Sequence, residues 1–212
     1  DCYENLTDLK KSFIQFANAI PFYGKVAICI DHKNTSSILT KIKRPFITFG
    51  INEEAEIRAT NFIFNNNHSS FDLLVNNKIL EKINIQAPGK HNITNALGAI
   101  SLALELEIPI NKIKAGLSSY NGVRRRFEIK FILKNEIMII DDYAHHPSEV
   151  SSTLNAAKSG WNKRIIAIFQ PHLFTRTRDF HKEFAKAFLN SDILIITDIY
   201  PARELPISGV TA

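Results

Sequence analysis

The chain has 212 residues, of which 45% are hydrophobic and 22% are charged, so it is long and apolar enough to hold one large or two small cores. A folded, globular protein is therefore expected, and intrinsic disorder is not. The formal net charge of +5 would suit a polyanionic partner, and equally an enzyme that handles nucleotides and phosphates. Because the lysines are scattered and no long basic run alternates with aromatic residues, a nucleic-acid partner is the weaker interpretation.

The number of cysteines and the length of the apolar segments indicate the cellular compartment of the protein. Cys2 and Cys29 are too few and too unpatterned for a disulfide framework or a zinc site, which favours a reducing cytoplasm. No apolar run reaches the roughly 20 residues of a membrane span, and the start lacks the pattern of a signal peptide. We therefore expect a cytoplasmic protein without membrane contact. The absent starting methionine and the uncapped end at 208–212 further predict a segment of a longer protein.

The first part of the chain begins with an amphipathic helix. Apolar residues recur at helical spacing from Leu6 to Ile20, and Pro21 ends the helix before a buried strand over 25–30. The pattern then changes to short strands that predict a small sheet. These strands lie at 46–49, 55–64, 71–75 and 79–85, with a turn at 76–77 between the last two.

Two helices and two strands come next, and beyond them helices and strands alternate. A helix of about five turns begins at His91, and a second covers 110–120. Two strands joined by a tight turn at Lys134-Asn135 follow at 127–133 and 136–141. The remaining elements are a helix over 148–158, a strand over 164–169, a helix over 179–189 and a strand over 193–197. This order predicts an α/β protein with a parallel sheet, divided into two parts near Arg126.

Polar clusters follow three of the predicted strands. They lie at 141–143, 170–172 and 198–201. Because ligands bind at the carboxyl ends of parallel strands, we expect these clusters to form one site.

The first cluster extends over 141–147 and contains two aspartates, a tyrosine and two histidines. Carboxylates suit ribose hydroxyls or Mg²⁺, and imidazoles can donate to a phosphate or a carboxylate. The alternative is that one aspartate caps the following helix and one histidine is buried and satisfied. A zinc pair at His145 and His146 is less favoured, because adjacent histidines point in different directions and no third ligand is near.

The second cluster, over 169–178, offers His172, Arg176 and Arg178 before the next predicted helix. Arginine binds carboxylate and phosphate with two parallel hydrogen bonds. Solvated arginines would be unfavourable at the start of a helix, and an anionic ligand would offset that cost.

Two other groups of polar residues allow a binding role and an ordinary one. Arg124, Arg125 and Arg126 could bind phosphates or form a solvated charge run. His91, Asn92 and Asn95 open a helix, where the two asparagines could contact an adenine edge or cap the helix. The Gly-rich P-loop signature is absent from the sequence, so any nucleotide site is incomplete.

Five motifs together resemble the Mur ligases, the ATP-dependent, amide-forming enzymes of bacterial peptidoglycan synthesis. In order, they lie at 89–96, 125–128, 141–147, 169–172 and 198–204. The first two are shared across the family, and the last three resemble its alanine-adding members. The resemblance covers nearly the whole chain.

The resemblance implies a particular place in a three-domain enzyme. Residues 1–126 resemble the later part of the central ATP-binding domain, and 127–212 resemble the Rossmann-like C-terminal domain without its end. The chain would begin just after the magnesium-binding segment, and it is expected to be inactive alone. The implied reaction activates the carboxylate of UDP-N-acetylmuramate with ATP and Mg²⁺ as an acyl phosphate, which the amine of L-alanine attacks.

The resemblance also implies roles for individual residues. The adenine side would be held by His91, Asn92 and Asn95, the phosphates by Arg125 or Arg126, and the ribose by Asp142. Alanine and the reacting carboxylate would be surrounded by Tyr143, His145, His172 and Arg176, the last three being catalytic. Two positions depart from the family pattern: Arg124 replaces a common glycine, and Leu173 a common arginine, for which Arg178 could compensate.

Three alternatives stay open on the sequence alone. One is a related Mur-type ligase that adds a peptide to a muramoyl substrate. Another is a non-catalytic nucleotide or nucleic-acid binder, whose affinity would fall steeply with salt. The last is a zinc hydrolase centred on His145 and His146.

Overall fold

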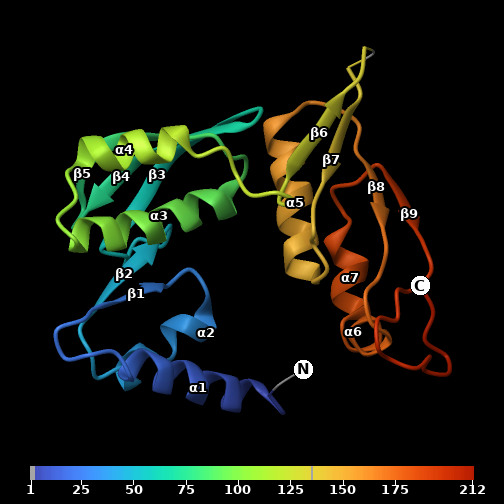
Figure 1. Ribbon diagram of the computed structural model, residues 1–212, viewed down its shortest axis with the longest axis horizontal. Helices are drawn as coiled ribbons and strands as arrows, with labels where there is room; N and C mark the ends of the chain where they lie inside the picture. Colours follow the sequence, from blue (N-terminus) through green and yellow to red (C-terminus); the bar gives the residue numbers. More distant parts are fainter. Residues whose placement is uncertain (1–2, 135) are drawn as a thin grey trace. The chain divides into compact units, whose positions relative to one another are not determined.

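The computed structural model describes residues 3–134 and 136–212, and the chain divides into two compact units (Figure 1). The first unit contains the residues up to Ile63 together with Ser69–Gln86 and His91–Tyr120. The second unit contains Phe64–His68, Ala87–Lys90 and Asn121–Ala212. Cys2 and Asn135, on which two of the sequence interpretations rest, lie outside the described residues.

A five-stranded sheet of order β1-β2-β3-β4-β5 forms the centre of the first unit. Its strands are β1 (Val26–Cys29), β2 (Phe46–Gly50), β3 (Ile57–Asn65), β4 (His68–Val75) and β5 (Lys78–Ile85). The strands β1 and β2 pair in parallel, as do β2 and β3, whereas β4 and β5 pair antiparallel. The predicted small sheet is confirmed, and the buried strand predicted before it joins the sheet as well.

Helices pack against this sheet and complete the core of the first unit (Figure 1). They are α1 (Leu6–Asn18), α2 (Lys33–Ser36), the 3₁₀ turn η1 (Leu39–Lys41), α3 (Lys90–Glu105) and α4 (Ile110–Ser119). On α3, Ile93, Leu97 and Ile100 are fully buried, as are Phe71 and Leu73 on β4. The three long helices were predicted. The elements α2 and η1 were not, because segments of four and three residues are too short to show helical periodicity.

Gly50, at the end of β2, has a backbone that a side chain would not tolerate. Its φ is +152°, and an added Cβ would overlap the carboxylate of Asp31, whose Cγ would be only 2.8 Å away. Oδ1 of that carboxylate already accepts hydrogen bonds from the backbone N–H groups of Ile51 and Asn52. We expect Gly50→Ala to lower the free energy of unfolding by about 2 kcal/mol or more, measured by urea denaturation.

Gly116, inside α4, is the matched control. No heavy atom lies within 4 Å of the place that a Cβ would take there, so Gly116→Ala should raise the free energy of unfolding by about 0.5–1 kcal/mol. Equal urea midpoints for Gly50→Ala and the unchanged chain would show that the Asp31 contact does not constrain the turn.

Where the structure describes it, the second unit consists of two small sheets and three helices. Its elements are β6 (Glu128–Ile132), β7 (Met138–Asp141), α5 (Pro147–Gly160), β8 (Ile166–Phe169), α6 (Phe174–Asp179), α7 (His181–Ala187) and β9 (Ile193–Ile196). β6 and β7 pair antiparallel, and β8 and β9 pair in parallel. Val150, Leu154, Ala187 and Phe188 form the buried cluster between α5, β8 and α7.

The α/β class is therefore confirmed, but two details of the prediction were wrong. The strands of the second unit do not form one sheet, because β7 pairs only with β6 among the described residues. The helix predicted over 179–189 corresponds to α7, but the prediction missed α6, which begins at Phe174. No described helix combines the length and apolar character that crossing a membrane requires.

Candidate active site

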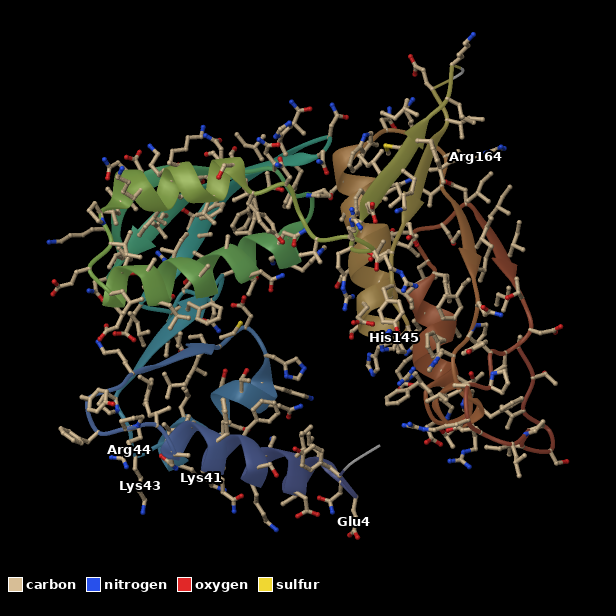
Figure 2. All side chains as sticks on the ribbon, viewed as in Figure 1. Glu4, Lys41, Lys43, Arg44, His145 and Arg164 are labelled. Atoms are coloured by element: carbon tan, nitrogen blue, oxygen red, sulfur yellow. The ribbon has the colours of Figure 1, made fainter. Side chains whose placement is uncertain are left out.

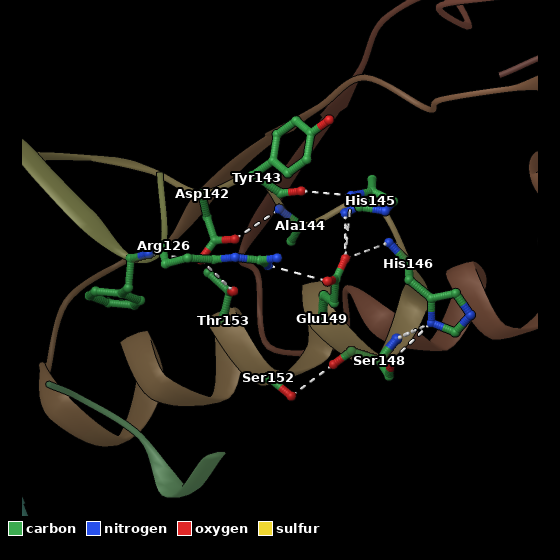
Figure 3. Close-up of polar contacts among 11 residues, drawn as sticks. Arg126, Asp142, Tyr143, Ala144, His145, His146, Ser148, Glu149, Ser152 and Thr153 are labelled. Atoms are coloured by element: carbon green, nitrogen blue, oxygen red, sulfur yellow. Dashed lines mark hydrogen bonds and ion pairs between the residues drawn. The ribbon is translucent and has the colours of Figure 1, made fainter. Parts of the chain in front are cut away.

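Asp142 organises the loop that joins β7 to α5 (Figure 3). Its Oδ2 accepts hydrogen bonds from the N–H of Phe127 and from Oγ1 of Thr153, both at 2.9 Å, and its Oδ1 accepts the N–H of Ala144 at 2.8 Å. Three donors, from the residue before β6, the loop itself and α5, therefore meet on one carboxylate. This role is structural, but it is not the helix cap that the sequence allowed for one of the two aspartates, because the N-cap of α5 is His146.

His146 begins α5 and points away from His145. Its Nδ1 lies 2.9 Å from Oγ of Ser148, its ring packs edge-on against Phe180, and it forms a capping box with Glu149. The two adjacent imidazoles thus have different partners. Among the residues that the structure describes, no group of three His, Cys, Asp or Glu side chains could hold a metal ion.

His145 is held with one ring nitrogen fixed as a donor. Its Nδ1 lies 2.9 Å from the backbone oxygen of Tyr143 and 3.5 Å from Oε2 of Glu149. Since a carbonyl oxygen only accepts, Nδ1 carries the hydrogen in the neutral ring. The lone pair is therefore on Nε2, which can accept a proton from a ligand.

His172 has the opposite tautomer. Nη1 of Arg176 lies 3.1 Å from its Nδ1, and a guanidinium only donates, so the hydrogen of neutral His172 is on Nε2. Burial lowers the pKa of His172, and the charge of Arg176 and then His145 lower it further. His172 is consequently a neutral hydrogen-bond donor near pH 7.

The three polar clusters of the second unit meet, although their strands do not share one sheet. The ring centroids of His145 and His172 are 6.2 Å apart, and Tyr143 packs edge-on against His145 at 5.2 Å. His172 stacks on Tyr200 at 5.6 Å, and a β-bridge joins these two residues. Figure 2 shows His145 near the start of α5. This group offers an acceptor nitrogen on His145, a donor nitrogen on His172 and the guanidinium of Arg176. Together they suit the ammonium and the carboxylate of an amino acid.

The basic segment before β6 lies next to this group. Arg125 and Phe127 have left-handed backbones, with φ of 59° and 45°. The guanidinium of Arg125 lies 4.4 Å from the ring centroid of Tyr143, and Nη1 of Arg126 lies 3.2 Å from Oε1 of Glu149. Arg124, which the sequence interpretation treats as a departure from the family pattern, is exposed. Side-chain contacts therefore link the predicted phosphate-binding arginines to the predicted amino-acid site.

The expectation drawn from the helix dipole was wrong for Arg176 and Arg178. Both lie in the last turn of α6, where cations are favourable, and not before a helix. Arg178 is exposed and pairs with Asp179 at 2.7 Å. Leu173 has a φ of 73° and precedes α6 without a capping side chain. Glu204 supplies the cap instead. Its carboxylate accepts hydrogen bonds from the backbone N–H of Thr175 at 3.0 Å and from the hydroxyl of Thr175 at 2.5 Å.

His91, Asn92 and Asn95 lie in the first two turns of α3. All three residues belong to the first unit, whereas Lys90, the first residue of α3, belongs to the second. His91 and Asn92 are half-buried and Asn95 is exposed. Ile93 and Ala96, which are buried, fix the face that α3 turns to the core.

Two carboxylates in the site were not assigned a role from the sequence. Glu149 could have been found, since a capping box has a Glu three residues after the N-cap, here His146. Glu204 belongs to the last quoted motif, but no local signal indicates that it caps a helix beginning about 30 residues earlier.

The titration of His172 should make the stability of the chain depend on pH, and we expect the free energy of unfolding to fall as the pH is lowered through about 6.5. The pKa of His172 is lower in the folded chain than its usual value of 6.5, so the unfolded chain takes up this proton first. Urea unfolding at pH about 7.5 and about 5.5 should show a smaller difference for His172→Gln than for the unchanged chain. The other titrating groups are common to both proteins and cancel. Equal pH dependence in the two proteins would contradict the burial of a neutral His172.

Comparison with known proteins places the chain in a class. Residues 1–103 match the sequence profile of the Mur ligase middle domain, and residues 125–208 match that of the Mur ligase, glutamate ligase domain. The chain belongs to the Mur ligase family, which confirms the resemblance drawn from its motifs.

Two similar proteins of known sequence share one name. The UDP-N-acetylmuramate--L-alanine ligase of Geotalea uraniireducens is 44% identical over 212 residues, which are 100% of this chain and 46% of the relative. The ligase of the same name from Geotalea daltonii is 45% identical over the same shares. The chain spans about half the length of these relatives. The crystal structure of UDP-N-acetylmuramate-alanine ligase from Thermotoga maritima superposes with a TM-score of 0.76 at 28% identity, covering 93% of this chain and 42% of that one.

Proposed function

We propose that the protein to which this chain belongs joins L-alanine to the carboxylate of UDP-N-acetylmuramate with consumption of ATP, in the cytoplasm, as a step of peptidoglycan synthesis. The observation that carries the proposal is the grouping of His145, His172 and Arg176 with opposite hydrogen-bonding roles. The names of the relatives support the same reaction.

We assign 1–126 to the ATP-binding domain and 127–212 to the domain that delivers the amino acid. In this assignment His91, Asn92 and Asn95 contact adenine, and Arg125 or Arg126 contacts the phosphates. Asp142 contacts the ribose through Oδ1, which accepts one hydrogen bond from Ala144, whereas Oδ2 accepts two.

The histidines and Arg176 have different roles toward alanine. The guanidinium of Arg176 binds a carboxylate with two parallel hydrogen bonds. The alanine ammonium must lose a proton before its nitrogen can attack, and Nε2 of His145 accepts that proton. The carboxylate of Glu149, 3.5 Å from Nδ1, then stabilises the imidazolium. Nε2–H of His172 donates to an oxygen of the reacting group, and Tyr143, which packs edge-on against His145, borders the alanine.

ATP supplies the phosphoryl group that makes the muramoyl carboxylate an acyl phosphate, from which phosphate leaves when the amine attacks. The Mg²⁺ that the family implies has no suitable ligand set among the described residues, so we assign it no step here. This chain's own residues contribute positioning, charge neutralisation and the acceptance of the alanine proton.

The test is phosphate release that depends on ATP, alanine and UDP-N-acetylmuramate. We would compare this chain with a version extended to the full length of its relatives, and expect release only from the extended protein. Release with a peptide but not with alanine would favour the related peptide-adding ligase. No release from a folded extended protein, together with RNA affinity that falls steeply with salt, would favour a nucleic-acid binder.

A further inference from the structure

Glu149 contacts both sides of the proposed site with one carboxylate (Figure 3). Its Oε1 lies 3.2 Å from Nη1 of Arg126, which we assign to the phosphates. Its Oε2 accepts the backbone N–H groups of His145 at 3.0 Å and His146 at 3.2 Å, and lies 3.5 Å from Nδ1 of His145. Every oxygen of this side chain therefore has a partner in or beside the site.

The electrostatics of Glu149 agree with a carboxylate that stays charged. Burial raises its pKa, but the N–H of His145, then the guanidinium of Arg126, then the charge of His145 and the N–H of His146 lower it, and the net direction is down. Burial is partial, so the ion pair with Arg126 is exposed to competition from other anions.

We infer that Glu149 is a positioning residue that couples the nucleotide side of the site to the proton acceptor His145. Arg126 and the imidazolium of His145 compete for the same negative charge. A phosphate that binds Arg126 weakens the ion pair between Arg126 and Glu149. The negative charge of Glu149 then stabilises the imidazolium of His145 more strongly, so His145 accepts a proton most readily when the nucleotide is bound. The inference rests on the proposed function for its meaning, but its geometry can be tested apart from activity.

The first experiment uses nitrogen-15 NMR on this chain. At a pH where His145 is neutral, its Nδ1 should carry the hydrogen, and the guanidinium of Arg126 should rotate slowly. Glu149→Gln keeps the size of the side chain and an oxygen that accepts the two backbone N–H groups. We expect Arg126 to rotate several-fold faster in this variant. Glu149→Ala should in addition move His145 toward a mixture of its two tautomers.

Glu136→Gln is the matched control, because it removes the charge of a glutamate whose ion-pair partner, at 2.8 Å, is Lys163 and not a residue of the site. It should change neither signal. If Glu149→Ala does not fold, Glu149→Gln decides alone. Unchanged rotation of Arg126 in a folded Glu149→Gln would overturn the inference.

The second experiment measures kinetics in the extended protein. Glu149→Gln should raise the KM for ATP and lower kcat, each about tenfold, and the acidic limb of the pH profile of kcat should shift. A residue that only capped α5 would reduce the amount of folded enzyme and leave the KM and the profile unchanged, which would also count against the coupling. If the extended protein has no ligase activity, the proposed function fails, and the NMR result still decides whether Glu149 holds Arg126 and His145.

Discussion

Asp142→Ala is expected to lower the free energy of unfolding of this chain by about 3 kcal/mol, which is large for a domain of ordinary stability. The half-buried carboxylate accepts three hydrogen bonds of 2.8–2.9 Å, from Phe127, Ala144 and Thr153. Truncation leaves these donors without their charged acceptor, and bonds to a charged group contribute more than neutral ones. Urea denaturation followed by circular dichroism measures the loss.

Thr153→Val is the graded control, because it removes one of the three donors and keeps the shape of the side chain. It should cost about 1 kcal/mol. If Asp142 served only as a ribose contact, Asp142→Ala would unfold at the same urea concentration as the unchanged chain. Nucleotide affinity alone would then fall, and the structural role given to Asp142 here would be wrong.

The length and regularity of an element decided whether the sequence could predict it. The helix α3 has 16 residues with Ile93, Leu97 and Ile100 on one face, and this periodicity is visible without any tertiary information. The helix α6 has six residues, of which only Phe174 is apolar, so no apolar stripe marks it. Its cap comes from Glu204, far along the chain, which no local pattern can reveal.

The candidate site shows a similar division. That the segments around His145, His172 and Tyr200 would meet follows from their positions after strands, even though β7 is not hydrogen-bonded to β8. Which ring nitrogen carries the hydrogen depends on the Tyr143 carbonyl and on Arg176, and such partners are set by backbone direction. The sequence therefore indicates which residues form the site, whereas the structure is needed to show which of their atoms donate hydrogen bonds and which accept them.

Arg176→Lys is expected to lower kcat/KM for alanine about 100-fold in the extended protein. Lysine keeps the charge but cannot make two parallel hydrogen bonds to a carboxylate, and losing a desolvated charged contact costs about 2–5 kcal/mol. Lysine also removes the guanidinium that now lies 3.1 Å from Nδ1 of His172 and sets its tautomer. Steady-state kinetics with alanine varied at saturating ATP measure the effect, and the KM for ATP should stay within about twofold.

Arg178→Lys is the matched control, since Arg178 lies on the same helix, is exposed and pairs with Asp179. Its activity should remain within about twofold of the unchanged protein. Equal losses in the two variants would mean that Arg178 shares the carboxylate, which is the compensation for Leu173 expected from the sequence. A loss confined to Arg178→Lys would assign the contact to Arg178 and leave Arg176 as the residue that orients His172.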